Sequence, residues 1–180
     1  DNLNVDLENE TVTANVTVKN TGSVAGKDVV QLYVSLPYTD YDKEHGVEKA
    51  AIQLLDYGKT AELAPGASET VTITADMQNM ASWDSTADNA VGTKGCYILD
   101  AGDYWFTIGN GAHEALNNVL AAKCGDAVAG KLIDQDGNVV TGNTAAVATW
   151  TAPNTEVDTQ KYRNSRYNSD VEVTNTFDDA

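Results

Sequence analysis

The sequence predicts an all-β protein built as an antiparallel β-sandwich, with a C-terminal extension that contains a short helix and a hairpin. Two observations support this prediction. About seven short segments alternate apolar and polar residues or are rich in β-branched residues, and turn residues separate them. Helices of about 10–15 residues do not alternate with these segments, which argues against parallel βαβ units.

Two segments have the clearest strand pattern. Residues 11–19 and residues 69–77 alternate strictly, which is typical of strands with one buried face. Residues 27–36 are apolar on both sides, which predicts a central strand, and residues 51–57 predict another short strand. The residues expected to form the core are Val12, Val16, Val18, Val30, Leu32, Val34, Val71, Ile73, Phe106 and Ile108.

Turns and loops are expected between these strands. Residues 63–66, Leu-Ala-Pro-Gly, predict a tight turn because proline fixes φ and glycine adopts positive φ. Residues 96–99 and 103–108 are predicted to pair as a hairpin around Asp-Ala-Gly-Asp. Residues 38–48, which follow Pro37, are expected to form a polar loop.

The chain changes character after the predicted sandwich. Residues 112–123 carry apolar residues at helical spacing, and Gly125 follows as a stop signal. Residues 131–141 predict a hairpin that turns at Asp-Gly. The expected organisation is a sandwich over residues 1–111, a helix-and-hairpin extension over 112–150 and an extended polar linker over 151–180.

The charge balance limits the possible partners. The chain has 27 acidic and 11 basic residues, a formal net charge of −16. Such a field repels phosphates, so nucleic acids and anionic membranes are not expected partners. Solubility is the favoured interpretation of this acidity, and a cation-binding role is the alternative. No apolar run approaches the ~20 residues that span a bilayer.

Cysteines, histidines and acidic loops give no strong metal or cofactor motif, so neither is expected. Cys96 and Cys124 are too few for a disulfide framework and are expected to be thiols. His45 and His113 lack metal-site spacing; an exposed His45 and a packed or capping His113 are expected. Residues 134–138 only faintly resemble a calcium loop, because their glycine comes fourth, and a hairpin turn is favoured.

Aromatic residues provide the candidate binding surfaces. Tyr38, Tyr41, Trp83 and Trp105 could stack on sugar rings; the favoured interpretation packs the tryptophans against the sandwich and places the tyrosines in a contact between domains. Residues 38–49 combine tyrosines, charges of both signs and a glycine, a composition typical of interfaces within a chain. The candidate contact residues are Tyr38, Asp40, Tyr41, Lys43 and His45.

Several ordered motifs add a family resemblance. The stretch VTVKNTGSVAGKDVVQLYVSLP at residues 16–37, QLLDYGKT at 53–60, LAPGASETV at 63–71 and AGDYWFTIGN at 101–110 together resemble the fibronectin type III-like domain of glycoside hydrolase family 3 enzymes. The resemblance covers about residues 3–110 and implies an immunoglobulin-like sandwich. Residues 173–180 look like the start of a barrel segment, which resembles family members with permuted domain order.

The resemblance implies a function for a longer parent protein. It implies a retaining β-glycosidase, most often a β-glucosidase, in which this module is non-catalytic and buttresses the catalytic domains. The family's catalytic residues lie in the barrel and in the α/β sandwich, so none is carried over to this chain. A carbohydrate-binding or protein-interaction module is the alternative. A stand-alone enzyme is disfavoured because the sequence contains no recognisable nucleophile–base constellation.

Overall fold

The computed structural model describes residues 2–88, 92, 94–158, 164–165 and 168–172, so the predicted barrel start at residues 173–180 lies outside the described residues. The chain divides into two units. The first comprises Asp1–Leu36, Ala50–Asn79 and Tyr104–Trp150, and the second comprises Pro37–Lys49, Met80–Asp103 and Thr151–Ala180. The strand pairings within the described sheets are antiparallel, in agreement with the predicted antiparallel sandwich.

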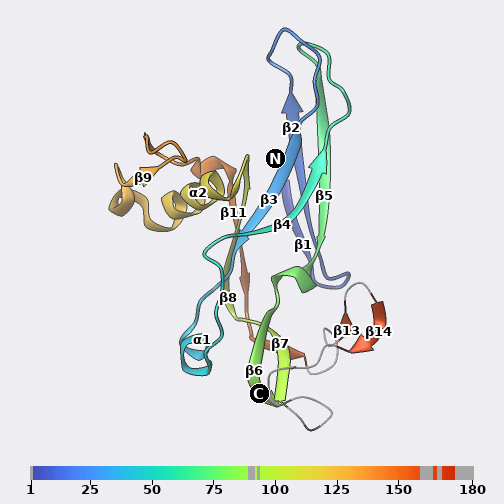
Figure 1. Cartoon of the computed structure of the whole chain (residues 1–180), viewed down its shortest axis with the longest axis vertical. Helices are drawn as coiled ribbons and strands as arrows, with labels where there is room; N and C mark the ends of the chain where they lie inside the picture. The colour runs from blue at the N-terminus through green and yellow to red at the C-terminus, as the bar shows by residue number, and fades with distance from the viewer. Residues whose placement is uncertain (1, 89–91, 93, 159–163, 166–167, 173–180) are drawn as a thin grey trace. The chain divides into compact units, whose positions relative to one another are not determined.

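Figure 1 labels most of the helices and strands, which follow one another along the chain in this order. The strands are β1 (Asn2–Asp6), β2 (Thr11–Lys19), β3 (Val29–Ser35), β4 (Gln53–Lys59), β5 (Ser68–Asp76), β6 (Ser82–Asp88), β7 (Lys94–Leu99), β8 (Gly102–Gly109), β9 (Leu132–Ile133), β10 (Val139–Val140), β11 (Val147–Ala152), β12 (Glu156–Asp158), β13 (Asn164–Ser165) and β14 (Asn168–Glu172). The helices are α1 (Asp40–His45) and α2 (Ala112–Cys124), with short 3₁₀ turns η1 (Met77–Met80), η2 (Gly125–Val128) and η3 (Thr144–Ala146).

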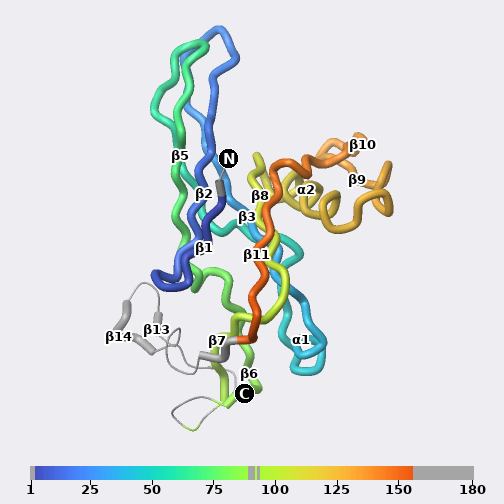
Figure 2. The backbone as a smooth tube through the Cα atoms, turned by 180° about the vertical axis from the view of Figure 1, so that it is seen from behind, coloured from blue at the N-terminus to red at the C-terminus, as the bar shows by residue number. Residues whose placement is uncertain are grey.

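The first unit contains the sandwich. One sheet has the strand order β1-β2-β5 and the other the order β11-β8-β3-β4. Strands β2 and β5 pair along their whole length, and Figures 1 and 2 show them side by side. Alternation sets the buried face as predicted, because Val12 and Ala14 of β2 and Ile73 and Ala75 of β5 are buried.

The core prediction is confirmed for most residues and wrong for three. Leu32, Val34 and Phe106 are among the most completely buried side chains. Val16, Val18 and Ile108, which were expected in the core, are only half-buried. Val16 and Ile108 border an open cleft of about 490 Å³, and Val18 borders a smaller cleft of about 260 Å³, so solvent reaches all three.

Gly58 of β4 lies where the two sheets of the sandwich approach closely. A Cβ atom at this position would lie 2.4 Å from Val71 Cγ1 and 3.2 Å from Ile73 Cγ1, both on β5. Side chains larger than hydrogen would therefore push the sheets apart at this point. The predicted turn at residues 63–66 is also present, with Gly66 at φ +80° and a hydrogen bond from Ala67 N to Ala64 O.

The hairpin predicted from residues 96–99 and 103–108 is wrong. Strand β7 pairs with β6 and β12, whereas β8 pairs with β3 and lies next to β11. The local Asp-Ala-Gly-Asp turn signal was misleading because each strand finds partners distant in the sequence. Gly102, the first residue of β8, has φ +122°, and a Cβ there would lie 3.1 Å from Pro37 Cβ.

The extension contains the predicted helix and hairpin. Helix α2 ends at Cys124, and Gly125 with φ +51° follows as its C-cap. Strands β9 and β10 pair antiparallel, and Gly137 in their turn has φ +85°. Part of the segment expected to be an extended linker forms strand structure, because β11 continues to Ala152 and β12 pairs with β7.

Candidate functional site

Residues 38–48 contain helix α1, so the expectation of a loop without regular structure is wrong. Thr39 and Asp42 form a capping box: Thr39 Oγ1 accepts from Asp42 N at 3.2 Å, and Thr39 N donates to Asp42 Oδ2 at 2.6 Å. Gly46 ends the helix in the left-handed region at φ +69°. The Thr-x-x-Asp spacing and the glycine were visible in the sequence and could have predicted this helix.

A buried ion network lies behind α1. Lys49 Nζ is 2.9 Å from Asp42 Oδ2, 2.5 Å from Asp100 Oδ2 and 2.9 Å from the carbonyl oxygen of Pro37. The three charged side chains are at most 4 % exposed. Burial raises the pKa of Asp100, and the adjacent Lys49 only partly opposes this shift. The network therefore joins two segments of the second unit, 37–49 and 80–103, and its charged groups are shielded from solvent.

Asp84 is a third buried carboxylate, and it accepts a hydrogen bond from Tyr41. The Tyr41 hydroxyl donates to Asp84 Oδ2 at 2.5 Å, and Asp84 Oδ1 accepts from Thr86 N and Thr86 Oγ1, both at 2.7 Å. The hydrogen bond between Tyr41 and Asp84 raises the pKa of Tyr41 to about 12. Burial alone would raise the pKa of Asp84, but the bonds from Tyr41 and Thr86 outweigh it and hold that pKa below its ordinary value.

The five predicted contact residues divide into two groups. Tyr38 is 50 % exposed, and Asp40 and Lys43 form an exposed ion pair at 2.8 Å. Tyr41 is half-buried because of its bond to Asp84, and His45 stacks on it with ring centroids 3.8 Å apart. The expectation of an exposed His45 is therefore wrong, since its ring packs on Tyr41 and its Nδ1 lies 2.9 Å from Tyr41 O.

The other aromatic residues and His113 also have specific partners. Trp83 packs edge-on to Tyr97 within the second unit, with ring centroids 4.9 Å apart. Trp105 is half-buried in the sandwich, and Lys123 Nζ lies 5.6 Å from its ring centroid. His113 is exposed rather than packed, and its Nε2 lies 2.7 Å from Ile133 O.

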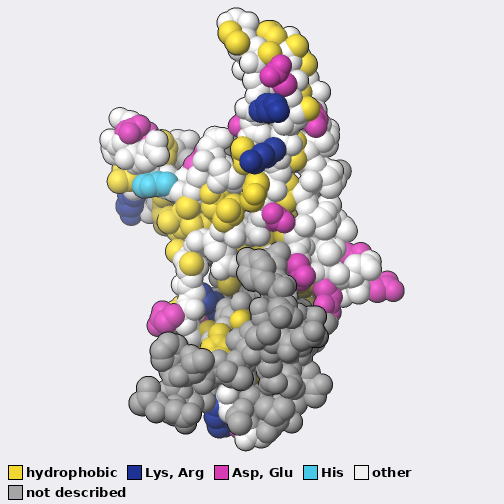
Figure 3. All heavy atoms as spheres, turned by 45° about the vertical axis from the view of Figure 1, so that its right-hand side comes forward, with side chains coloured by type: hydrophobic (Ala, Val, Ile, Leu, Met, Phe, Trp, Pro, Cys, Tyr) yellow, Lys and Arg dark blue, Asp and Glu magenta, His cyan; other side chains and the backbone are white. Residues whose placement is uncertain are grey.

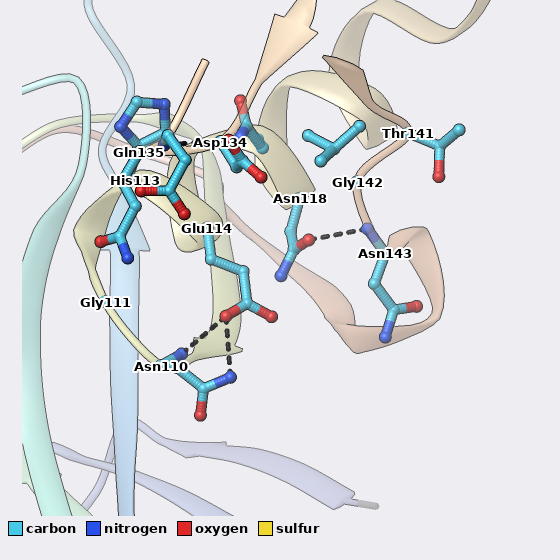
Figure 4. A pocket seen from close by; sticks show the side chains of 13 residues that line it. Asn110, Gly111, His113, Glu114, Asn118, Asp134, Gln135, Thr141, Gly142 and Asn143 are labelled. Carbon is cyan, nitrogen blue, oxygen red and sulfur yellow. Dashed lines mark hydrogen bonds between the residues drawn. The ribbon is translucent and has the colours of Figure 1, made fainter. Parts of the chain in front are cut away.

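A pocket of about 470 Å³ lies in the first unit, bordered by the start of α2, the β9–β10 hairpin and residues 141–143 (Figure 4). Asn118 of α2 is 2 % exposed, and its Oδ1 accepts from Asn143 N at 2.7 Å. Its Nδ2 donates to Ile108 O at 3.2 Å, so this amide connects β8, α2 and the following loop. Glu114 Oε2 accepts from both the backbone and side-chain nitrogens of Asn110, at 3.0 and 2.9 Å.

Metal binding finds no support among the described residues, where no three histidine, cysteine or acidic side chains form a group suited to an ion. Asp134, in the faint calcium-like sequence, serves the hairpin turn instead. Its Oδ1 accepts from Asp136 N at 2.9 Å and from Asn138 N at 2.8 Å. Hydrogen bonds from Asn138 hold the pKa of Asp134 below its ordinary value.

Surface charge shows no single focus on the face drawn in Figure 3, where acidic side chains lie at several separate places. In the described part of the chain, no helix has the length and apolar character to span a bilayer. Both cysteines are thiols; Cys96 is buried and Cys124 is exposed.

Sequence reasoning missed the polar residues that the fold brings together. In the sequence, Lys49 is only one charge of a mixed segment, and its partner Asp100 lies in a predicted turn. The helix over residues 112–123 is predicted from its apolar residues alone, so the pattern does not single out Asn117 and Asn118. Both side chains are nevertheless buried. Two adjacent asparagines inside an apolar helix pattern are a usable signal, because a buried amide needs partners from the fold.

The comparisons with known proteins agree on one part of the chain. Residues 28–112 match the family described as fibronectin type III-like domain. β-Glucosidase A of Butyrivibrio fibrisolvens is 38 % identical over 105 residues, which cover 58 % of this chain and 12 % of that protein. A β-glucosidase of Ruminococcus albus is 36 % identical over 98 residues, 54 % of this chain and 10 % of that protein.

Solved structures show a similar fold over more of the chain. A β-glucosidase from Paenibacillus barengoltzii matches 87 % of this chain and 14 % of its own, with a TM-score of 0.53 and 26 % identity. β-Glucosidase 3B from Thermotoga neapolitana matches 88 % of this chain and 16 % of its own, with a TM-score of 0.53 and 22 % identity. The chain spans about a tenth of the length of the Butyrivibrio fibrisolvens and Ruminococcus albus β-glucosidases.

Proposed function

We propose, from the premise that residues 28–112 form a fibronectin type III-like domain, that this chain is a non-catalytic structural module of a larger β-glycosidase. One observation carries the proposal. The chain aligns with only about a tenth of the length of each curated relative, and both of those relatives are β-glucosidases. A segment of this size supplies one domain of a much longer chain.

The buried acidic side chains support a structural role for the second unit. Lys49 binds Asp42 and Asp100, and Tyr41 binds Asp84. The three carboxylates have almost no exposed surface. A glycosidase needs two carboxyl groups that flank a sugar ring and reach it. These three carboxylates hold segments of the protein together instead.

The exposed side of α1 is the surface that we assign to a catalytic domain of the same parent chain. Tyr38 offers an exposed aromatic ring, with Lys43 Nζ 5.9 Å from its centroid. The ion pair of Lys43 with Asp40 adds charges of both signs beside that ring. Aromatic residues bordered by charges are typical of contacts within a chain. Tyr41 and His45 contribute by fixing the helix.

The proposed organisation keeps a sandwich module over residues 1–111 and an extension over residues 112–150, with residues 151–180 leading to a following barrel domain. In this organisation the parent protein is a retaining β-glycosidase of glycoside hydrolase family 3. The coding sequence on both sides of this chain tests the organisation directly. An α/β domain before it and a barrel after it are expected, and a stop codon directly after residue 180 would contradict it.

Catalysis by the chain itself is tested with aryl β-glucosides. The purified 180-residue chain is expected to release no more aryl alcohol than buffer does. Turnover that co-purifies with the chain through successive columns, and is lost on heat unfolding, would contradict the non-catalytic assignment.

The contact assignment is tested in the longer protein that includes the flanking domains. Tyr38→Ser is expected to lower its melting temperature or activity while leaving the melting temperature of the 180-residue chain nearly unchanged. Tyr57→Ser is the matched control, since Tyr57 is 54 % exposed on β4, outside α1. Equal tolerance of both changes in the longer protein would place the contact elsewhere.

A further inference from the structure

We propose that the pocket between α2 and the β9–β10 hairpin binds a neutral mono- or disaccharide through hydrogen bonds. This inference goes beyond a structural role and does not depend on it. It rests on three properties of the pocket: the chemistry of its lining, the rigidity of its polar groups and its charge.

Carboxamides are the most frequent side-chain group in the lining. Five of the lining residues carry this group: Asn110, Asn117, Asn118, Gln135 and Asn143. Asn117 and Asn118 are buried and shape the wall, whereas Asn110, Gln135 and Asn143 are exposed. A carboxamide contains both donors and an acceptor, as each sugar hydroxyl both donates and accepts. An ammonium or metal ligand would instead require acceptors alone. The volume of about 470 Å³ is in the range of small-molecule sites, roughly 300–1,000 Å³.

Several of these polar groups are fixed before any ligand arrives. Asn117 is 7 % exposed, and its Nδ2 donates to Ile133 O at 2.7 Å, which connects α2 to β9. Asn118 fixes the loop at Asn143 through its Oδ1. The pocket wall is therefore preorganised, and binding a ligand requires little further ordering of these side chains.

Glu114 provides an acceptor directed into the pocket. Its Oε2 takes two hydrogen bonds from Asn110, which hold the carboxylate in one orientation. In Figure 4 its other oxygen points toward the open space that Asn118 and Asn143 border on the opposite side. A ligand hydroxyl placed there can donate to Glu114, in a charge-assisted bond of the stronger class.

The charges of the lining select against anions. Glu114, Asp134 and Asp136 are acidic, and none of the lining residues is a lysine or an arginine. A phosphate or a sugar acid would meet repulsion without a counter-charge. His113 is the one aromatic residue in the lining, and Val140 is the one branched aliphatic residue. This scarcity of apolar surface disfavours flat apolar ligands.

The experiment is a titration of the ¹⁵N-labelled 180-residue chain, followed by amide chemical shifts. D-Glucose and cellobiose are expected to cause saturable shifts within residues 110–118 and 134–143, with a dissociation constant on the order of millimolar. D-Glucuronate is expected to bind about tenfold more weakly because of its carboxylate. Absence of saturable shifts with both neutral sugars overturns the proposal, as does binding of D-glucosamine alone, which would indicate a cation site.

A charge variant tests the assigned role of Glu114. Glu114→Gln retains the shape of the side chain and removes its charge, so the preference for glucose over glucuronate is expected to fall several-fold. Glu62→Gln is the matched control, because Glu62 is exposed and outside the pocket lining. An unchanged preference in Glu114→Gln, with the fold intact by circular dichroism, contradicts the proposal. Sugar binding and aryl-glucoside turnover are separate readouts, so this inference and the structural assignment can fail independently.

Discussion

The Tyr41 hydroxyl donates a hydrogen bond to Asp84 Oδ2 at 2.5 Å, and Asp84 has no exposed surface. The bond joins α1 to β6 within the second unit. His45 stacks on the same tyrosine ring. The Tyr41 side chain therefore contacts His45 of α1 and Asp84 of β6 at the same time.

Tyr41→Phe should destabilise the chain. The ring and its stacking on His45 remain, but Asp84 Oδ2 loses its donor in a buried position, which costs about 1–3 kcal/mol. Urea unfolding followed by circular dichroism measures the change. Tyr38→Phe is the control, since its exposed ring makes no bond to a buried group, and equal losses in both variants would contradict this account.

Alkaline pH should weaken the same contact. The folded state raises the pKa of Tyr41 from 10.0 to about 12, so the neutral phenol is favoured in the folded chain. The stabilisation is complete below about pH 10 and is lost as pH rises toward about 12. Melting temperatures measured across this range should fall less steeply in Tyr41→Phe than in the unmodified chain. Parallel curves for the two proteins would count against the assignment.

Lys49→Met should be among the most damaging single changes in the second unit. It leaves Asp42 and Asp100 buried without their cation, and breaking a buried pair in this way costs about 3–5 kcal/mol. Lys43→Met removes an exposed pair with Asp40 and should change stability little. Denaturant midpoints compare the variants, and similar midpoints would mean that solvent reaches the Lys49 network.

Leu32→Ala should lower the stability of the sandwich by ~2–5 kcal/mol, through lost burial and a cavity. Leu32 is 1 % exposed on β3, whereas Leu54, on the neighbouring β4, is 48 % exposed. Leu54→Ala should therefore cost less than about 0.5 kcal/mol. Chemical unfolding of both variants tests the facing of the two strands, and a reversed order would show that it is misassigned.

The sandwich was predictable where the pattern is local. Strict alternation in β2 and β5 revealed their buried faces, and Pro65-Gly66 revealed the turn before β5. The separate partners of β7 and β8 were not predictable, because strand pairing depends on residues far away in the sequence. The same limit applies to Lys49, whose carboxylate partner Asp100 lies 51 positions along the chain.

The candidate pocket was less accessible to sequence analysis than the fold. Aromatic residues directed attention to sugar stacking, whereas the pocket presents amides and carboxylates from α2 and the following loop. Asn118 is recognisable as a pocket residue only after the fold shows that it accepts a bond from Asn143, which is 25 positions away. The adjacent asparagines in the sequence indicate that buried amides need partners, but they do not say which residues supply them.

The pairing of β2 with β5 has a consequence for the order of events during folding. Thr13 and Thr74 face each other across this ladder although 61 positions separate them, and Thr17 and Thr70 are 53 positions apart. A long stretch of chain must lose its freedom before the first of these contacts forms, and that entropic barrier slows assembly. Lengthening the connection between the two strands should therefore have only a small effect on how stable the finished sandwich is. Its main effect should be on how long the newly made chain remains with β2 and β5 unpaired and open to aggregation.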